Sequence, residues 1–242
     1  MAVALCTARA RELLGGLPER IEVLLSANIL KNAMGVGIPG TGMIGLPIAV
    51  ALGAQIGRSE YGLEVLRDVT PEAVARARDY LAADAVSVAL KEGISETLYV
   101  EVHCTAGGRR AEAVIAGSHT RFVYLACDGE VVLDRRTGAS SREEEPCVPL
   151  TLRRVFDYAL TAPIDELAFI DEARRLNMAA AELALGGEYG HSLGRSLRGR
   201  RELHVMGDSL FSRMLAYTSA ACDARMAGAM VPGMSNSGSG NQ

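Results

Sequence analysis

The fold is decided by residues 97–134, which read TLYVEVHCTAGGRRAEAVIAGSHTRFVYLACDGEVVLD. Apolar and polar residues alternate in four short runs of this stretch, as they do in strands that bury one face, at residues 97–105, 111–116, 120–127 and 131–134. Gly107-Gly108 and Asp128-Gly129 lie between runs, where residues that accept a positive φ favour tight hairpin turns. The stretch therefore predicts a four-stranded antiparallel meander.

The segment before this meander predicts one amphipathic helix. Thr70-Pro71-Glu72 combines an N-cap hydroxyl, a proline at the first helical position and an acidic first turn, which together mark a helix start. Apolar residues at helical spacing continue to Leu90, at Val74, Ala77, Leu81, Ala85 and Val88. The helix and the meander make a two-layer unit. Residues 61–67 predict a further short strand.

The remainder of the chain predicts mainly helices. They span residues 2–14, 44–56, 163–185 and 202–230, with one alternating strand at residues 19–27. A polar, proline-bearing stretch at residues 135–149 marks a boundary. We therefore predict an α+β fold in which a mostly helical, discontinuous domain (1–60 and 148–242) is interrupted by a smaller inserted α+β domain (61–147).

Composition excludes several functional classes. The 242 residues are 49% hydrophobic and 22% charged, enough for a large core, and their net charge of −4 argues against a nucleic-acid or anionic-membrane binder. Five cysteines without a C-x-x-C pattern predict reduced thiols, and no secretory signal opens the sequence. The long uncharged stretch 32–57 contains seven glycines and two prolines, so we expect a buried loop and helix there rather than a membrane span. A cytoplasmic protein is expected.

The segment SANILKNAMGVGIPGTGM (26–43) is the first candidate binding region. It joins a predicted strand to a predicted helix, and its glycines let backbone amides approach a ligand near a helix N-terminus, which favours anions. Of the 25 basic residues only Lys31 and Lys91 are lysines. A lysine kept within this loop favours a functional ammonium over a chance residue. The spacing matches neither a Walker A nor a G-x-G-x-x-G motif.

Other polar residues leave alternatives open. By composition alone the final Met234–Gln242 string favours a flexible tail over a polar ligand cradle. Asn177 falls on the apolar side of its helix, where a structural hydrogen bond and a substrate contact are equally expected. We expect Asp223 and Arg225 to form structural ion pairs, and His103 to be solvated on a polar strand face. The spacing of the four histidines predicts no metal ligand.

Three segments together resemble one family: SANILKNAMGVGIPGTGM (26–43), AGSHTRFVYL (116–125) and ACDARMAGAMVPGMSNSGSGNQ (221–242). They are similar to the iron–sulfur L-cysteine desulfidases, which are related to the alpha chain of bacterial L-serine dehydratase. The resemblance implies β-elimination from a small amino acid. Cysteine would give sulfide, ammonia and pyruvate, and serine would release water instead of sulfide. It also implies a [4Fe–4S] cluster held by three cysteines, with one iron open to the substrate, and a further cysteine as base.

Under this resemblance the final string is a substrate-binding loop rather than a tail. The candidate substrate-binding residues are Lys31, Asn32, Ser235, Asn236, Ser237, Gly238 and Asn241. None of the five cysteines matches a cluster-ligand or base position of the family, so we assign no catalytic and no metal-binding residue. We expect a desulfidase body clipped at both ends, without its cluster and inactive alone.

Alternative hypotheses stay open from the sequence. One is a deaminating lyase of the L-serine dehydratase type. Another is a non-catalytic chain that binds an amino acid or complements a second polypeptide supplying the missing cysteines. The expected ligand in each case is a small amino acid, L-cysteine or L-serine, while a second copy or a complementing chain is the macromolecular partner that the resemblance allows.

Overall fold

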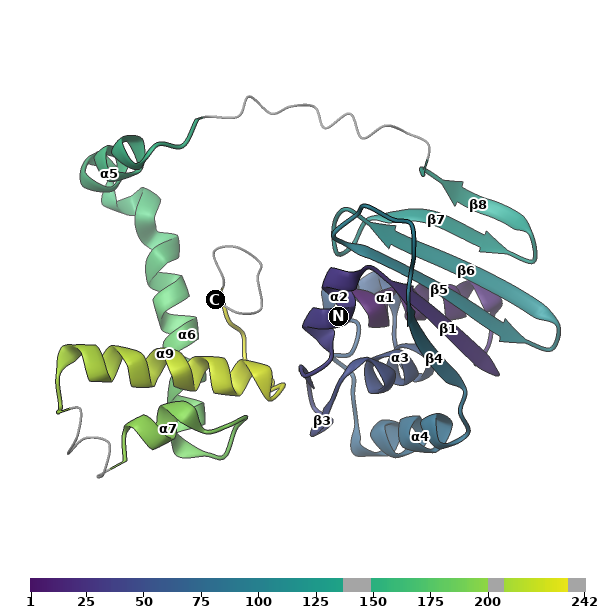
Figure 1. The fold of residues 1–242 in the computed structure, drawn as a ribbon, viewed down its shortest axis with the longest axis horizontal. Helices are drawn as coiled ribbons and strands as arrows, with labels where there is room; N and C mark the ends of the chain where they lie inside the picture. Colours follow the sequence, from purple (N-terminus) through teal and green to yellow (C-terminus); the bar gives the residue numbers. More distant parts are fainter. Residues whose placement is uncertain (137–148, 200–206, 235–242) are drawn as a thin grey trace. The chain divides into compact units, whose positions relative to one another are not determined.

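The computed structural model describes residues 1–136, 149–199 and 207–234. Its contacts divide the chain into two units (Figure 1). Unit 1 comprises Met1–Thr137 with Ala227–Met230, and unit 2 comprises Gly138–Met226 with Val231–Gln242. The predicted α+β class is confirmed, because unit 1 contains a six-stranded sheet with helices and the described part of unit 2 is helical.

The predicted meander forms the larger part of the sheet in unit 1. It consists of β5 (Tyr99–Ala106), β6 (Arg109–Ala116), β7 (Phe122–Cys127) and β8 (Glu130–Asp134), paired antiparallel in sequence order. Two further strands extend it to the order β4-β1-β5-β6-β7-β8. β1 (Arg20–Leu25) pairs antiparallel with β5 and parallel with β4 (Val86–Leu90). The sheet therefore draws on residues far outside the meander.

Two predictions between residues 60 and 90 were wrong. Helix α4 (Pro71–Ala82) begins where expected, with Thr70 Oγ1 accepting from the Ala73 backbone N–H at 3.3 Å, but it ends eight residues early. Asp84 then adopts a positive φ of 54°, and the chain continues as β4. Instead of the strand predicted at 61–67, a 3-10 helix η1 (Ser59–Glu64) forms, and its Gly62 has a φ of 56° that extended backbone does not allow.

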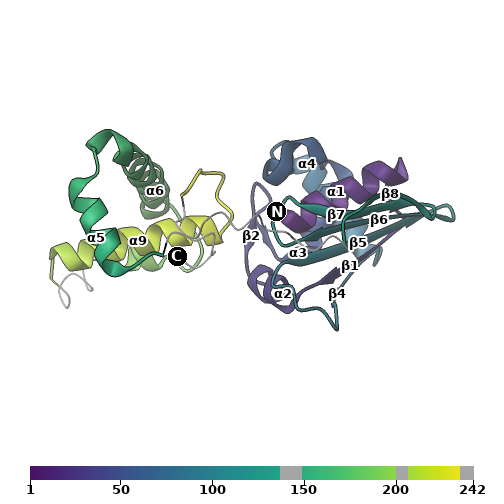
Figure 2. The ribbon, with the colours of Figure 1, turned by 90° about the horizontal axis from the view of Figure 1, so that it is seen from above.

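Helices α1 (Ala2–Leu14), α3 (Leu46–Gln55) and α4 lie on one face of the sheet (Figure 2). Every second strand residue faces these helices and contributes to the core. Burying each such side chain stabilises the unit by about 1.5–3 kcal/mol relative to leaving it exposed. These core residues include Ile21, Val23, Val100 and Val102. α1 packs so closely on α3 that a Cβ on Gly53 would clash with the backbone of Ala4. The opposite face carries the polar alternate residues.

This arrangement divides the chain differently from the predicted domains. The prediction placed residues 1–60 with the helices of 148–242, whereas α1, β1 and α3 belong to the same unit as the meander. The reason is that β1 is an internal strand of the sheet and α1 covers β5 and β6. Sequence periodicity reports each element but not its pairing partner.

Unit 2 contains α5 (Leu152–Thr161), η2 (Ile164–Leu167), α6 (Ala168–Gly186), α7 (Leu193–Leu197) and α9 (Leu210–Met226). The small residues of α9 allow close packing, because a Cβ on Gly194 of α7 would clash with the backbone of Ala216 and Ala220. Asp223 Oδ2 accepts from the Gly194 backbone N–H at 2.9 Å. Asp223 therefore binds the start of α7, and among the residues that the structure describes it does not form the ion pair expected from the sequence. No described helix is both long and apolar enough to cross a membrane.

Candidate functional site

The first motif begins at Ser26, which is buried at the end of β1. Its Oγ donates to the Thr97 carbonyl at 2.9 Å, and its backbone N–H donates to the Tyr99 carbonyl at 3.0 Å. The short helix α2 (Ala27–Ala33) follows directly. Because these bonds tie residue 26 to the strand next to β1, the start of α2 is fixed to the sheet.

Lys31 and Asn32, the first two predicted binding residues, are both exposed on α2. Asn32 Nδ2 donates to Asn28 Oδ1 one turn earlier, at 3.3 Å. Lys91 is paired with Glu101 at 2.8 Å, whereas Lys31 forms no salt bridge within the described residues. The Lys31 ammonium is therefore free to meet an anion from solvent.

The glycine-rich loop, defined here as residues 35–45, is an ordered hairpin. It contains the short strands β2 (Gly37–Ile38) and β3 (Met43–Ile44), joined by a turn in which Gly40 and Gly42 have φ of 73° and 63°. Buried Thr41 closes the turn, since its Oγ1 donates to the Ile38 carbonyl at 2.7 Å and accepts from the Met43 N–H at 2.9 Å. The loop leads into α3 as predicted, and the helix begins at Leu46.

Residues 227–230, from the third motif, pack against this loop within unit 1. A Cβ on Gly37 would clash with the backbone of Ala227, and a Cβ on Gly228 would lie 2.7 Å from the Gly37 carbonyl carbon. Gly228 also has a φ of 74°. We call this contact between Gly37 and Gly228 the glycine crossing. It brings the first and last motifs together through backbone contacts that a side chain would prevent.

The second motif lies at the same end of the sheet as Ser26. Its turn between β6 and β7 is held by the Gly117 backbone N–H, which donates to the Leu98 carbonyl at 3.0 Å. Leu98 precedes Tyr99, the strand residue that bonds Ser26. Gly117 has a φ of 77°, and His119 is exposed. Turn geometry accounts for this motif.

In unit 2, Asn177 of α6 binds the residue that precedes the predicted substrate loop. Its Nδ2 donates to the Met234 carbonyl at 2.9 Å, and its Oδ1 accepts from the Met234 N–H at 2.9 Å. Of the two roles left open for Asn177, the structure shows the structural hydrogen bond. The next residues, Ser235, Asn236, Ser237, Gly238 and Asn241, lie outside the described residues.

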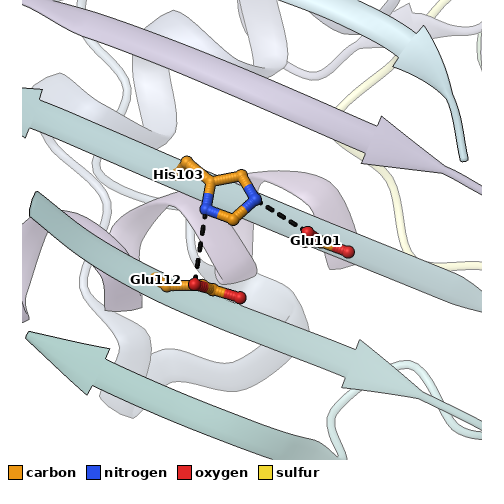
Figure 3. Close-up of side chains that lie close together, drawn as sticks. All are labelled: Glu101, His103 and Glu112. Atoms are coloured by element: carbon orange, nitrogen blue, oxygen red, sulfur yellow. Dashed lines mark hydrogen bonds and ion pairs between the residues drawn. The ribbon is translucent and has the colours of Figure 1, made fainter. Parts of the chain in front are cut away.

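Sequence reasoning missed a polar cluster on the face of the sheet opposite the helices. His103 was expected to be solvated but is only 7% exposed, and its Nε2 lies 2.7 Å from Glu101 Oε1 (Figure 3). Lys91 Nζ and the Tyr99 hydroxyl bind the other Glu101 oxygen at 2.8 and 2.6 Å. The alternation of the sequence places residues 99, 101 and 103 on one face of the strand. This pattern was the signal from which the polar cluster could have been predicted.

Electrostatics support this cluster. Burial on its own would raise the pKa of Glu101, but hydrogen bonds from His103, Lys91 and Tyr99 outweigh it and lower the pKa to about 2. Burial and the hydrogen bond to Glu101 raise the pKa of the Tyr99 hydroxyl. Glu101 is therefore an ionised acceptor over the whole physiological pH range.

The described cysteines do not form a cluster site. Burial raises the pKa of the Cys6 thiol well above its usual value and that of Cys104 to about 12, which disfavours the thiolate that binds iron. Cys127 is half-buried and donates toward the Leu13 carbonyl at 3.3 Å. Cys222 is exposed in unit 2, and Cys147 lies outside the described residues.

The molecule is thus an α+β protein that presents a glycine-rich loop crossed by a second glycine segment. The family of the serine dehydratase alpha chain matches residues 60–242, and the chain belongs to this family. The resemblance inferred from the three motifs is confirmed at this level.

Curated relatives agree over the whole chain. It is 65% identical over 242 residues to a UPF0597 protein of Bacteroides thetaiotaomicron, and 62% identical over 242 residues to one of Bacteroides fragilis. A UPF0597 protein of Phocaeicola vulgatus is 58% identical over 243 residues. Each match covers 100% of this chain and 56% of the relative, so the chain spans about half the length of the curated relatives it matches. No solved structure matches.

Proposed function

We propose that this chain is the body of an iron–sulfur lyase that eliminates the β-substituent of a small amino acid. The substrate class is L-cysteine, giving sulfide, ammonia and pyruvate, with L-serine as the alternative. The single observation that carries the proposal is the glycine crossing, because it joins the two longest motifs that resemble this family. Membership of the serine dehydratase alpha family supports an amino acid as substrate.

In this proposal the chain binds and orients the substrate. The exposed ammonium of Lys31 meets the substrate carboxylate, and Asn32 supplies an amide beside it. Ser235, Asn236, Ser237, Gly238 and Asn241 stay proposed substrate-binding residues, because their hydroxyl, amide and backbone groups are of the kinds that bind an amino acid. Asn177 positions this loop by fixing Met234, the residue before it.

A [4Fe–4S] cluster would supply a Lewis-acidic iron for the leaving group. The four described cysteines do not fit one, because the cluster needs three thiolates and two of the four are buried with raised pKa values. No step of the elimination is therefore assigned to this chain's own cysteines. The same observation favours a second candidate function: an amino-acid-binding chain that is complemented by cysteines from another polypeptide.

Anaerobic reconstitution with iron and sulfide tests the proposal. The purified chain is mixed with L-cysteine or L-serine, and sulfide, pyruvate and bound iron are measured. We expect neither turnover nor a stoichiometric cluster from this chain alone. Robust turnover with one cluster per chain would overturn the claim that the cluster and base cysteines are absent from it. Activity that appears only when a second cysteine-bearing polypeptide is added would favour the complementing role.

A further inference from the structure

The polar cluster continues as a row across three strands. In the sheet register Glu22 of β1 lies opposite His103 of β5, and His103 lies opposite Glu112 of β6. Directly opposed residues point to the same face, with Cβ atoms roughly 4.5–5.5 Å apart. The register therefore places the His103 imidazole between Glu22 and Glu112 on the face that the helices leave uncovered, and Figure 3 shows His103 beside Glu112.

The orientation of the imidazole is set by Glu101. Nδ1 accepts from the Arg110 guanidinium, which can only donate, so the ring N–H that faces Glu101 Oε1 at 2.7 Å is on Nε2. This is the arrangement in which a carboxylate orients a metal-binding histidine from behind. Nδ1 faces Glu112, whose Oε2 lies 3.6 Å from it.

The separation of these two atoms suits a shared cation. Zinc binds histidine nitrogen and carboxylate oxygen at about 2.0–2.2 Å, so two tetrahedral ligands lie roughly 3.4 Å apart. The observed 3.6 Å is close to this value. Glu101, His103 and Glu112 each place a ligand atom within 4.8 Å of the others. Little movement would be needed to bind an ion between Nδ1 and Glu112.

The position is open to solvent and already holds a positive charge. A cavity of about 370 Å³ is lined by polar side chains that include Glu22, His103 and Arg110. The exposed Arg110 guanidinium donates to His103 Nδ1 at 3.0 Å, on the side where a metal would bind. The Arg110 guanidinium therefore occupies the position that a metal ion would take. Its long side chain can rotate outward to solvent and leave that position open.

We propose that Nδ1 of His103, with the carboxylate of Glu112, binds a divalent transition metal ion of the zinc class in the cavity that Glu22 also lines. A nitrogen ligand beside carboxylates favours zinc or cobalt over magnesium and calcium, which prefer oxygen ligands alone. Glu101 is a positioning residue that holds the ring. The site lies on the sheet of unit 1 and is independent of the proposed lyase reaction.

Calorimetric titration of Zn²⁺ into the metal-free chain tests this site, with Co²⁺ absorption as a second readout of tetrahedral nitrogen and oxygen ligation. We expect one equivalent bound by the wild type. His103→Gln and Glu112→Gln should each weaken binding at least tenfold. Arg110→Gln should tighten it, since the competing guanidinium is removed. Circular dichroism checks that each variant is folded.

His119→Gln is the matched control, because His119 is exposed in the turn between β6 and β7 and lies outside the row. It should bind Zn²⁺ as the wild type does. If folded His103→Gln bound Zn²⁺ with unchanged affinity, the proposal would be overturned, because thiols or other groups would then be the ligands of the ion. Absence of binding in both the wild type and Arg110→Gln would also overturn it.

Discussion

The glycine crossing and the polar cluster are built in opposite ways. At the crossing, Gly37 and Gly228 lack side chains, and the two backbones approach because nothing separates them. In the cluster, Glu101 and His103 are buried polar side chains whose ring nitrogens and carboxylate oxygens are hydrogen-bonded. The first region is specified by shape and the second by charge. Substitutions should therefore disturb the two regions in different ways, through steric overlap at the crossing and through pH at the cluster.

Gly37→Val should have the largest effect on stability. A side chain there overlaps the Ala227 backbone, and overpacking of this kind costs typically about 1–3 kcal/mol, with more where backbone must move. The free energy of unfolding, measured by urea denaturation, should fall by about 3 kcal/mol.

Gly35→Val is its matched control, since a Cβ on Gly35 meets no atom within 4 Å. It should change the free energy of unfolding by less than about 1 kcal/mol. Equal losses in the two variants would show that the crossing does not form as described.

Glu101→Gln should show the contrasting, pH-dependent effect. The folded-state pKa of Glu101, lowered from 4.5 to about 2, means that its stabilising contribution is present above pH 4.5 and is lost as pH falls toward 2. The variant should be less stable than the wild type by about 1–2 kcal/mol at pH 7 after allowance for solvent screening.

The two proteins should converge in stability between pH 4.5 and pH 2, as followed by denaturation at several pH values. Glu130→Gln, at an exposed position on β8, should leave the pH profile unchanged. A wild-type advantage that persists undiminished at pH 2 would contradict the assigned network.

Asn177→Ala should have the smallest effect on global stability. Two hydrogen bonds to Met234 are lost at a partly exposed position, which costs about 1 kcal/mol or less. The sharper readout is hydrogen exchange of the Met234 amide, which should lose its protection. Asn32→Ala should not change that exchange, because Asn32 bonds only Asn28. Retained protection in Asn177→Ala would remove Asn177 from the role of positioning residue.

The sequence predicted the parts of this fold that depend on local pattern. Alternation and the Asp128-Gly129 turn located the meander, and Thr70 located the start of α4. The strand β4 was missed because Ala85 and Val88 also fit a helical spacing. Val86 of this strand pairs with Ile21, 65 residues earlier, and no local signal reports a parallel pair at that distance. Long-range pairing also moved residues 1–60 out of the predicted helical domain.

Prediction of the candidate site from the sequence is limited in the same way as prediction of the fold. The glycines of residues 35–45 were visible as a motif, but their contact with Gly228 depends on the tertiary fold. His103 was expected to be solvated because its strand face is polar. It is only 7% exposed, and long polar neighbours, Glu101 and Arg110, bind its two ring nitrogens. Burial on a polar face depends on side-chain packing, which periodicity does not describe.

Calorimetric titration of L-cysteine and L-serine into the wild type and Lys31→Met measures whether this chain binds the amino-acid substrate. We expect the wild type to bind at least one of the two, and Lys31→Met to bind it about tenfold more weakly, the loss expected for one charge-assisted hydrogen bond. Arg153→Met, an exposed control on α5, should bind as the wild type does. No binding of either amino acid by the wild type, or equal affinity in Lys31→Met, would show that the proposed binding role is wrong.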